Sequence, residues 1–205
     1  RIRVAQGLKR RRAGRAKPGL VALARAGGRE TARASCFDLG FVLGPRLNAA
    51  GRLADMSLGI ECLIADDAGR AANCAQELDR LNRERRRIES EMQDGATAAL
   101  DRMTEPPGAT VALFDAGWHQ GVVGILAARV RERMHRPTIC FAQGENGELR
   151  GSGRSIPGLH LRDCLDLVAK RAPGLLLRFG GHAQAAGLTI RESDFERFAA
   201  LFERT

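Results

Sequence analysis

Aromatic residues are scarce in this sequence, which has no tyrosine, one tryptophan and an aromatic content of 4% over 205 residues. Proteins that bind single-stranded nucleic acid without sequence preference commonly stack the bases on aromatic side chains. With so few aromatics, any nucleic-acid binding by this chain would depend on phosphate contacts, and it would weaken steeply as salt is added.

Long apolar runs and paired cysteines are also missing. No stretch is long enough to span a bilayer, and no basic-then-apolar leader precedes a small-residue cleavage site, so the sequence suggests neither a membrane protein nor export. The five cysteines are scattered, with no C-x-x-C pair, which argues against a disulfide framework and a structural zinc site. We therefore expect buried thiols in a reducing compartment, the cytoplasm.

Acidic residues grouped with histidines, as metal chemistry requires, are not found either. Asp38, Asp55, Asp66, Asp67 and Asp115 are available, but no H-E-x-x-H or D-x-D pattern joins them to a histidine. Two-metal cleavage of a phosphodiester needs several such ligands to converge within a few ångströms. The sequence thus predicts no catalytic residue and no metal ligand in this chain, although it leaves phosphate binding open.

Positive charge is in excess, and it is unevenly placed. The formal net charge is +9, but residues 1–33 contain eleven Lys and Arg against the single acid Glu30. The remaining 172 residues sum to −1, so overall basicity does not by itself indicate nucleic-acid binding. For the basic segment, a solvated face and a local docking surface both remain open. Because the sequence begins at Arg1 rather than Met, we expect it to be part of a longer chain.

The hydrophobic pattern predicts an α/β protein with a helical first part. Short helices are expected over residues 1–35 and a glycine-rich structured loop over 37–53. The longest helical pattern runs from about Asp66 to Met103, and a boundary follows at 104–109. Beyond it the pattern predicts a mixed sheet covered by helices. The strands are expected at 110–116, at 136–142, at 147–155, where the strand runs into a glycine-flanked turn, and at 185–190. The helices are expected at 121–135, 159–172 and 193–204.

Two glycine-containing motifs in the second half could bind an anion. In GSGRS (151–155), two glycines flank Ser152 and would expose backbone N–H groups, while Arg154 adds a planar charged fork; a glycine-rich hairpin with an exposed arginine is the alternative. WHQGVVGI (118–125) follows a strand and opens a helix, whose free N–H groups can receive an anion. His119 could contact a phosphate or transfer a proton, whereas Trp118 is expected in the core.

Two further stretches combine small residues with arginine or histidine. GPRLNAAGR (44–52) carries Arg46, Asn48 and Arg52, which suggests recognition of a phosphate or carboxylate; a structural ion pair is the alternative. RFGGHAQAAGLTI (178–190) reads neither as an ordinary strand nor as a helix. Its two adjacent glycines would let a ligand approach the backbone closely, with a histidine at the end of the bare stretch. A tight turn with a satisfied histidine is the alternative.

Six segments, read in order, resemble the RecJ family of bacterial single-strand-specific DNA exonucleases, within the DHH phosphoesterase superfamily. They are FVLGPRLNAAGRL, LDRLNRERRRIE, WHQGVVGILAARV, RPTICFA, GSGRSI and RFGGHAQAAGLTI, and together they extend over nearly the whole chain. The resemblance implies the C-terminal part of a DHH catalytic domain at 1–65, a long connecting helix at 66–104, and a DHH-associated substrate-binding domain at 105–205.

The resemblance also implies 5′-to-3′ degradation of single-stranded DNA in repair and recombination, with Mn²⁺ or Mg²⁺ held by a DHH part that these residues do not include. The expected substrate-binding set is Ser152, Arg154 and Arg52 for the 5′-phosphate, then Gly180, Gly181 and His182 at the cleft, and His119, Arg46 and Asn48. Single-stranded DNA and the DHH lobe of the same protein are the expected partners, with a single-strand-binding protein or a helicase as further ones. By itself the chain is expected to be inactive. Two alternatives stay open: a non-catalytic nucleic-acid-binding module, and a DHH-family phosphodiesterase for short oligonucleotides or cyclic dinucleotides.

Overall fold

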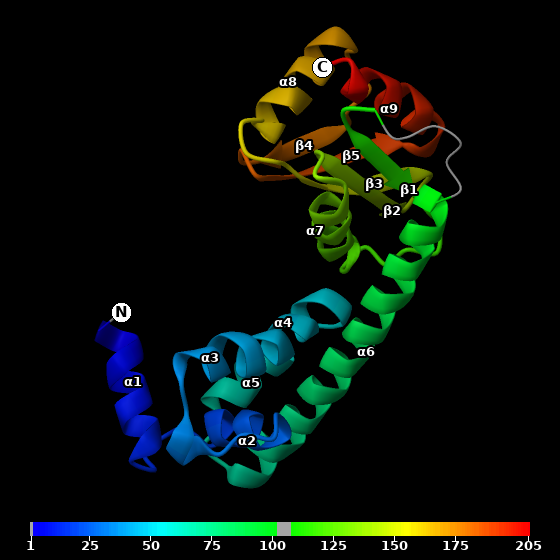
Figure 1. Ribbon diagram of the computed structural model, residues 1–205. Coiled ribbons are helices and arrows are strands. Elements are labelled where there is room, and N and C mark those ends of the chain that lie inside the picture. Colours follow the sequence, from blue (N-terminus) through cyan, green and yellow to red (C-terminus); the bar gives the residue numbers. More distant parts are fainter. Residues whose placement is uncertain (1, 102–107) are drawn as a thin grey trace. The chain divides into compact units, whose positions relative to one another are not determined.

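The computed structural model describes residues 2–101 and 108–205, and the chain divides into two compact units on either side of Arg87 (Figure 1). Regular structure in the described part of the first unit is helical. Its elements are α1 (Ile2–Arg12), α2 (Pro18–Ala26), η1 (Thr31–Arg33), α3 (Cys36–Asp38), η2 (Leu39–Leu43), α4 (Gly44–Leu53), α5 (Ser57–Ile64) and the start of α6 (Ala68–Asp101). The short helices predicted over residues 1–35 are thus confirmed.

The loop predicted over residues 37–53 is wrong, because this stretch is helical throughout. Ser35 caps the first turn: its hydroxyl accepts a hydrogen bond from the Asp38 N–H, and the Asp38 carboxylate accepts one from the Ser35 N–H. The π-helical turn η2 then passes directly into α4. Val42, Leu43 and Ala49 on this stretch are buried in the core of the unit, so packing holds a glycine-rich helix that local propensity disfavours.

The long helix predicted from about 66 to 103 is confirmed as α6, which has 34 residues. It carries an apolar stripe at helical spacing, of which Leu78, Leu81, Met92 and Ala96 are buried. The exposed side carries ion pairs three residues apart, such as Arg80 with Glu77 and Arg87 with Glu84, each with an N–O distance of 2.7 Å. The predicted boundary at 104–109 falls mostly on residues 102–107, which lie outside the described part of the chain.

The second unit contains a five-stranded mixed sheet with the strand order β1-β2-β3-β5-β4. The strands are β1 (Val111–Phe114), β2 (Thr138–Gln143), β3 (Glu148–Arg154), β4 (Arg178–Gly181) and β5 (Ala185–Arg191). Its further helices are α7 (Val123–Met134), α8 (Leu161–Arg171), η3 (Glu192–Asp194) and α9 (Phe195–Glu203). β1 and β2 are parallel, and the other neighbouring strands are antiparallel. The predicted α/β class with a mixed sheet is therefore confirmed.

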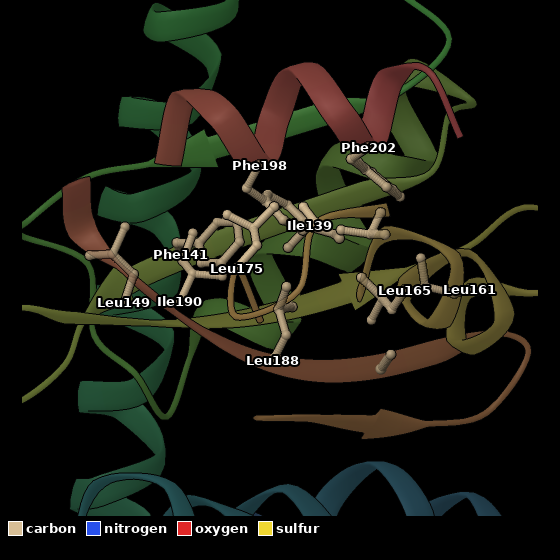
Figure 2. Packing of buried hydrophobic residues seen from close by; sticks show 13 residues of the cluster. Ile139, Phe141, Leu149, Leu161, Leu165, Leu175, Leu188, Ile190, Phe198 and Phe202 are labelled. Carbon is tan, nitrogen blue, oxygen red and sulfur yellow. The ribbon is translucent and has the colours of Figure 1, made fainter. Parts of the chain in front are cut away.

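One strand was not predicted: Arg178–Gly181 forms β4, an edge strand that pairs with β5. The sheet has helices on both faces (Figure 1). Figure 2 shows the core on one face, where Ile139 and Phe141 of β2 lie among side chains from β3, β5, α8 and α9. Phe141 and Phe198 meet edge to face, with ring centroids 5.4 Å apart. The opposite face of β2 and β3 is covered by α7.

The cysteines give a first testable prediction. All five are unpaired; Cys36 is exposed, while Cys62 and Cys140 are buried. Burial raises the pKa of the Cys62 thiol to about 11 and raises that of Cys140 as well. Since the thiolate is the nucleophile, and only about one Cys62 thiol in a thousand ionises near pH 8, iodoacetamide should label Cys36 first. Mass spectrometry of the labelled native chain tests this, and equal labelling of Cys62 and Cys36 would contradict it.

Candidate functional site

The GSGRS motif lies in a strand of the sheet and not in a turn, so the prediction of exposed backbone N–H groups there is wrong. Residues Gly151–Arg154 belong to β3, which pairs with β2 on one side and β5 on the other. The glycines serve packing: a Cβ on Gly151 would lie 2.5 Å from the Phe141 ring, and one on Gly153 would lie 2.7 Å from Leu161. The motif therefore offers the side chains of Ser152 and Arg154 on the opposite face, and not its backbone.

Ser152 and Arg154 form a small polar cluster beside the first turn of α7. The Arg154 Nη1 donates to the Ser152 Oγ at 3.2 Å and to the Gly153 carbonyl at 2.8 Å. Gly124 of α7 faces this pair, and a Cβ there would lie 2.8 Å from the Ser152 Oγ and 3.2 Å from an Arg154 nitrogen. Gly124 thus leaves room for a hydroxyl and a half-buried guanidinium at the junction of helix and sheet, a suitable pair of donors for an anion.

The register of the sheet extends this cluster into a strip across three strands. Ser152 of β3 lies opposite Gly187 of β5, which lies opposite Gly180 of β4. Paired residues of an antiparallel sheet share a face, so the strip runs from the Ser152 hydroxyl over two bare glycines. A Cβ on Gly180 would meet nothing within 4 Å, and one on Gly187 only the Gly151 carbonyl oxygen at 3.9 Å. This part of the sheet is exposed and lets a ligand contact the strands directly.

The Gly-Gly-His motif turns the chain at the end of this strip. Gly181 has a φ of 147°, and a Cβ there would lie 2.4 Å from the Ala185 carbonyl oxygen, so no other residue fits without a shift. The His182 N–H donates to that same carbonyl at 2.7 Å, which closes the β4–β5 hairpin. Its imidazole is exposed. The two glycines therefore act differently: Gly181 shapes the turn, and Gly180 leaves the strip bare.

His119 lies in the connection between β1 and α7. Its Nδ1 accepts a hydrogen bond from the Gly121 N–H at 3.0 Å, so the neutral ring carries its proton on Nε2, which can donate to an anion. The side chain is exposed at a hollow of about 410 Å³ that Met92 and Asp115 also line. The neighbouring Trp118 is 8% exposed, which agrees with its predicted place in the core.

Three predicted binding residues lie on α4 of the first unit: Arg46 is largely buried, whereas Asn48 and Arg52 are exposed. Arg46 is 13% exposed, and its guanidinium lies 2.8 Å from the Asp79 carboxylate and donates to the Val42 carbonyl at 2.7 Å. For Arg46 the structure thus supports the structural ion pair over substrate recognition. Asn48 and Arg52 are exposed and lie four residues apart, on one side of the helix.

Gly187 of the open strip is not among the predicted binding residues. Its signal was the alternation of β5, in which every second residue from Ala185 shares a face with Ser152 and Arg154, but that face could be assigned only once the register was known. Within residues 2–101 and 108–205, no three His, Cys, Asp or Glu side chains converge as a metal site. In the same ranges, no helix has the length and apolar character needed to cross a membrane.

Comparisons with known proteins place this geometry in a family. Residues 107–205 match the DHHA1 domain. The single-stranded-DNA-specific exonuclease RecJ of Dickeya dadantii is 51% identical over 205 residues, which are 98% of this chain and 36% of that protein. The crystal structure of RecJ with Mg²⁺ from Thermus thermophilus superposes with a TM-score of 0.81 at 33% identity, over 97% of this chain and 29% of that one.

A second RecJ structure, bound to manganese, matches with a TM-score of 0.80 at 34% identity, over 97% of this chain and 47% of that one. The chain thus spans about a third of the length of the curated relatives it matches. The similarity extends over both units, and the match to DHHA1 coincides with the sheet that carries the open strip. The chain therefore belongs to the RecJ family and contains that family's DHHA1 domain.

Proposed function

We propose that this chain is the DNA-holding part of a 5′-to-3′ single-stranded-DNA exonuclease that acts in DNA repair and recombination in the cytoplasm. The observation that carries the proposal is the Ser152–Arg154 cluster, set beside a strip of sheet that two exposed glycines leave bare. In this proposal residues 1–65 end a DHH catalytic domain, residues 66–104 connect it, and residues 105–205 bind the DNA.

A 5′-phosphate is the ligand that this cluster fits best. A terminal phosphate monoester carries about two negative charges near neutral pH, whereas an internal phosphodiester carries one. The planar Arg154 guanidinium can donate two parallel hydrogen bonds to such a group, and the Ser152 hydroxyl can donate a third. The strand would continue over Gly187 and Gly180, where no side chain obstructs its backbone, and His182 at the Arg154 end of the β4–β5 hairpin would contact it near its 5′ end.

The remaining predicted residues take supporting roles in this proposal. Arg52 and Asn48, exposed on α4 of the first unit, would bind DNA phosphates, and His119 of the second unit would donate its Nε2 proton to a phosphate oxygen. The relatives' structures were solved with Mg²⁺ or manganese, which would supply Lewis-acid chemistry. Since no three side chains of the described residues gather for such an ion, we assign no hydrolytic step to them.

The test is a titration of the 205-residue chain with fluorescent octadeoxynucleotides that carry either a 5′-phosphate or a 5′-hydroxyl. We expect the phosphorylated strand to bind more tightly, and Arg154→Gln to reduce that preference by about 1.5–3 kcal/mol, the range for a hydrogen bond to a charged group. Fluorescence anisotropy gives both affinities.

Arg162→Gln is the matched control, because Arg162 is exposed on α8, which packs on the face that holds the core. Its preference for the 5′-phosphate should equal that of the wild type. A cyclic dinucleotide, which has no terminal phosphate, should compete poorly, whereas strong competition would favour the alternative of a cyclic-dinucleotide enzyme. Equal affinity of the wild type for both strand ends would overturn the proposal.

A further inference from the structure

A second row of polar side chains crosses the same face of the sheet, one register step from the Ser152 row. Arg150 of β3 lies opposite Thr189 of β5, which lies opposite Arg178 of β4. Since the pairing is antiparallel, these side chains share the face that carries Ser152, Gly187 and Gly180. The bare glycine row therefore lies between the Arg154 end of the face and the Arg150–Thr189–Arg178 row.

The charges of this row are not neutralised within the described residues. Arg150 donates from Nη1 to the Gln120 amide oxygen at 3.2 Å, a contact that orients the guanidinium and leaves its charge in place. Across residues 2–101 and 108–205, neither Arg150 nor Arg178 forms an ion pair, and both are exposed. Arg191, further along β5, lies 3.5 Å from the Asp194 carboxylate. Arg150 and Arg178 are thus two exposed positive charges beside the bare strip, and both can bind an anion.

The spacing shows which anion this row can reach. Neighbouring strands are about 4.8 Å apart, so Arg150 and Arg178 stand roughly 10 Å apart on either side of Thr189, wide enough to flank a phosphodiester. Along β3, Arg150 and Arg154 are four residues apart, about 13 Å, so a single phosphate cannot reach both. A stacked strand rises about 3.4 Å per nucleotide and an extended one roughly twice that, so the two arginines are separated by two to four nucleotides.

The row of the sheet beyond Arg150 marks the end of the proposed DNA-binding surface. The next position of β3 on this face is Glu148, opposite Arg191, and its carboxylate would repel a phosphate. The face therefore holds three successive rows: an arginine row at Arg154, a bare row at Gly187, and a second arginine row at Arg150. A strand of at least three nucleotides fills all three rows, whereas a dinucleotide does not.

We propose that Arg150, Thr189 and Arg178 bind an internal phosphate of the same single strand whose 5′-phosphate is bound at Ser152 and Arg154. This inference rests on the proposed function. The second row makes the site select for chain length, because strands of three or more nucleotides gain contacts that a dinucleotide lacks. This row would therefore make the protein prefer longer single strands to dinucleotides as substrates.

The test combines a length series with salt dependence, using the 205-residue chain and 5′-phosphorylated oligodeoxythymidines of two, four and eight nucleotides. We expect the wild type to bind the tetranucleotide at least tenfold more tightly than the dinucleotide. In the double variant Arg150→Gln with Arg178→Gln this gain should disappear, while dinucleotide affinity stays within twofold. The slope of log affinity against log salt for the octanucleotide should fall by about 1.4, two contacts at roughly 0.7 each for single strands.

The possible outcomes distinguish the second row from the proposed 5′-phosphate site at Ser152 and Arg154. If the double variant keeps both the length gain and the salt slope while Arg154→Gln loses the 5′-phosphate preference, the second row is overturned and the proposed function stands. If the wild type shows no 5′-phosphate preference but the salt slope falls in the double variant, the 5′-phosphate site at Ser152 and Arg154 is overturned and the second row stands. No binding of any oligonucleotide by the wild type would overturn both. Arg162→Gln, on the opposite side of the sheet, should match the wild type throughout.

Discussion

Gly181→Ala is expected to lower the free energy of unfolding of the second unit by about 2–6 kcal/mol, the sum of backbone strain and overpacking. The native φ of 147° is one that residues with a Cβ rarely adopt, and the new Cβ would lie 2.4 Å from the Ala185 carbonyl oxygen and 2.5 Å from the Ala186 Cα. Urea denaturation followed by the fluorescence of Trp118, the sole tryptophan, reports on this unit.

The adjacent glycine supplies the matched comparison. A Cβ on Gly180 meets nothing within 4 Å, so Gly180→Ala should change stability by less than about 1 kcal/mol. The same methyl group stands on the bare strip, so single-stranded DNA should bind more weakly by about 1–2 kcal/mol. If Gly180→Ala leaves DNA affinity unchanged, the strip is not the path of the strand. If Gly181→Ala is as stable as the wild type, the hairpin does not need glycine there.

Arg46→Met is the second substitution with a large expected effect, and it acts on the first unit. It removes a guanidinium that is 13% exposed and leaves the Asp79 carboxylate, 14% exposed, without its nearest partner. Breaking a buried pair costs about 3–5 kcal/mol, and we expect about 3 kcal/mol because Arg83 remains 3.1 Å from Asp79. Hydrogen–deuterium exchange of peptides from α4, and from α6 around Asp79, measures the loss of protection.

Arg83→Met is the control for that experiment. Arg83 bonds to the same carboxylate, but its side chain is 72% exposed, so its removal should cost less than about 1 kcal/mol. Equal and small effects of the two variants would return Arg46 to the candidates for substrate recognition. A large loss of protection in Arg46→Met alone supports its structural role.

The parts of the fold that the sequence predicted are those with strong local patterns. The stripe from Leu78 to Leu100 predicted α6, and the short apolar segments at 136–142 and 185–190 predicted β2 and β5, because apolar residues there mark buried positions. The helical stretch around Val42 and the edge strand β4 could not be predicted, since both are rich in glycine and are held by partners distant in the sequence.

In the candidate site, too, features set by residue type were predicted, whereas features set by residues distant in the sequence were not. Ser152, Arg154 and the Gly-Gly-His stretch were singled out by residue type, and the structure brings Ser152 and Gly180 into one row of the sheet. The GSGRS glycines were misread as a turn, because the need for a missing Cβ came from Phe141 and Leu161 across the core and not from the local backbone. The choice between substrate binding and a structural ion pair stayed open for Arg46 in the sequence, because its partner Asp79 lies 33 residues away.

Photocrosslinking tests most directly whether the open face of the DHHA1 sheet holds the 5′ end of a single strand. The probe is a 5′-phosphorylated octadeoxynucleotide with 5-iodouracil as its first base, irradiated with the 205-residue chain and mapped by mass spectrometry. The account predicts crosslinks to the peptides that contain Ser152–Arg154 and Gly180–His182, and their loss in Arg154→Gln. Crosslinks confined to the basic residues 2–33 would contradict it, because the DNA would then be bound by the N-terminal charge and not by the sheet.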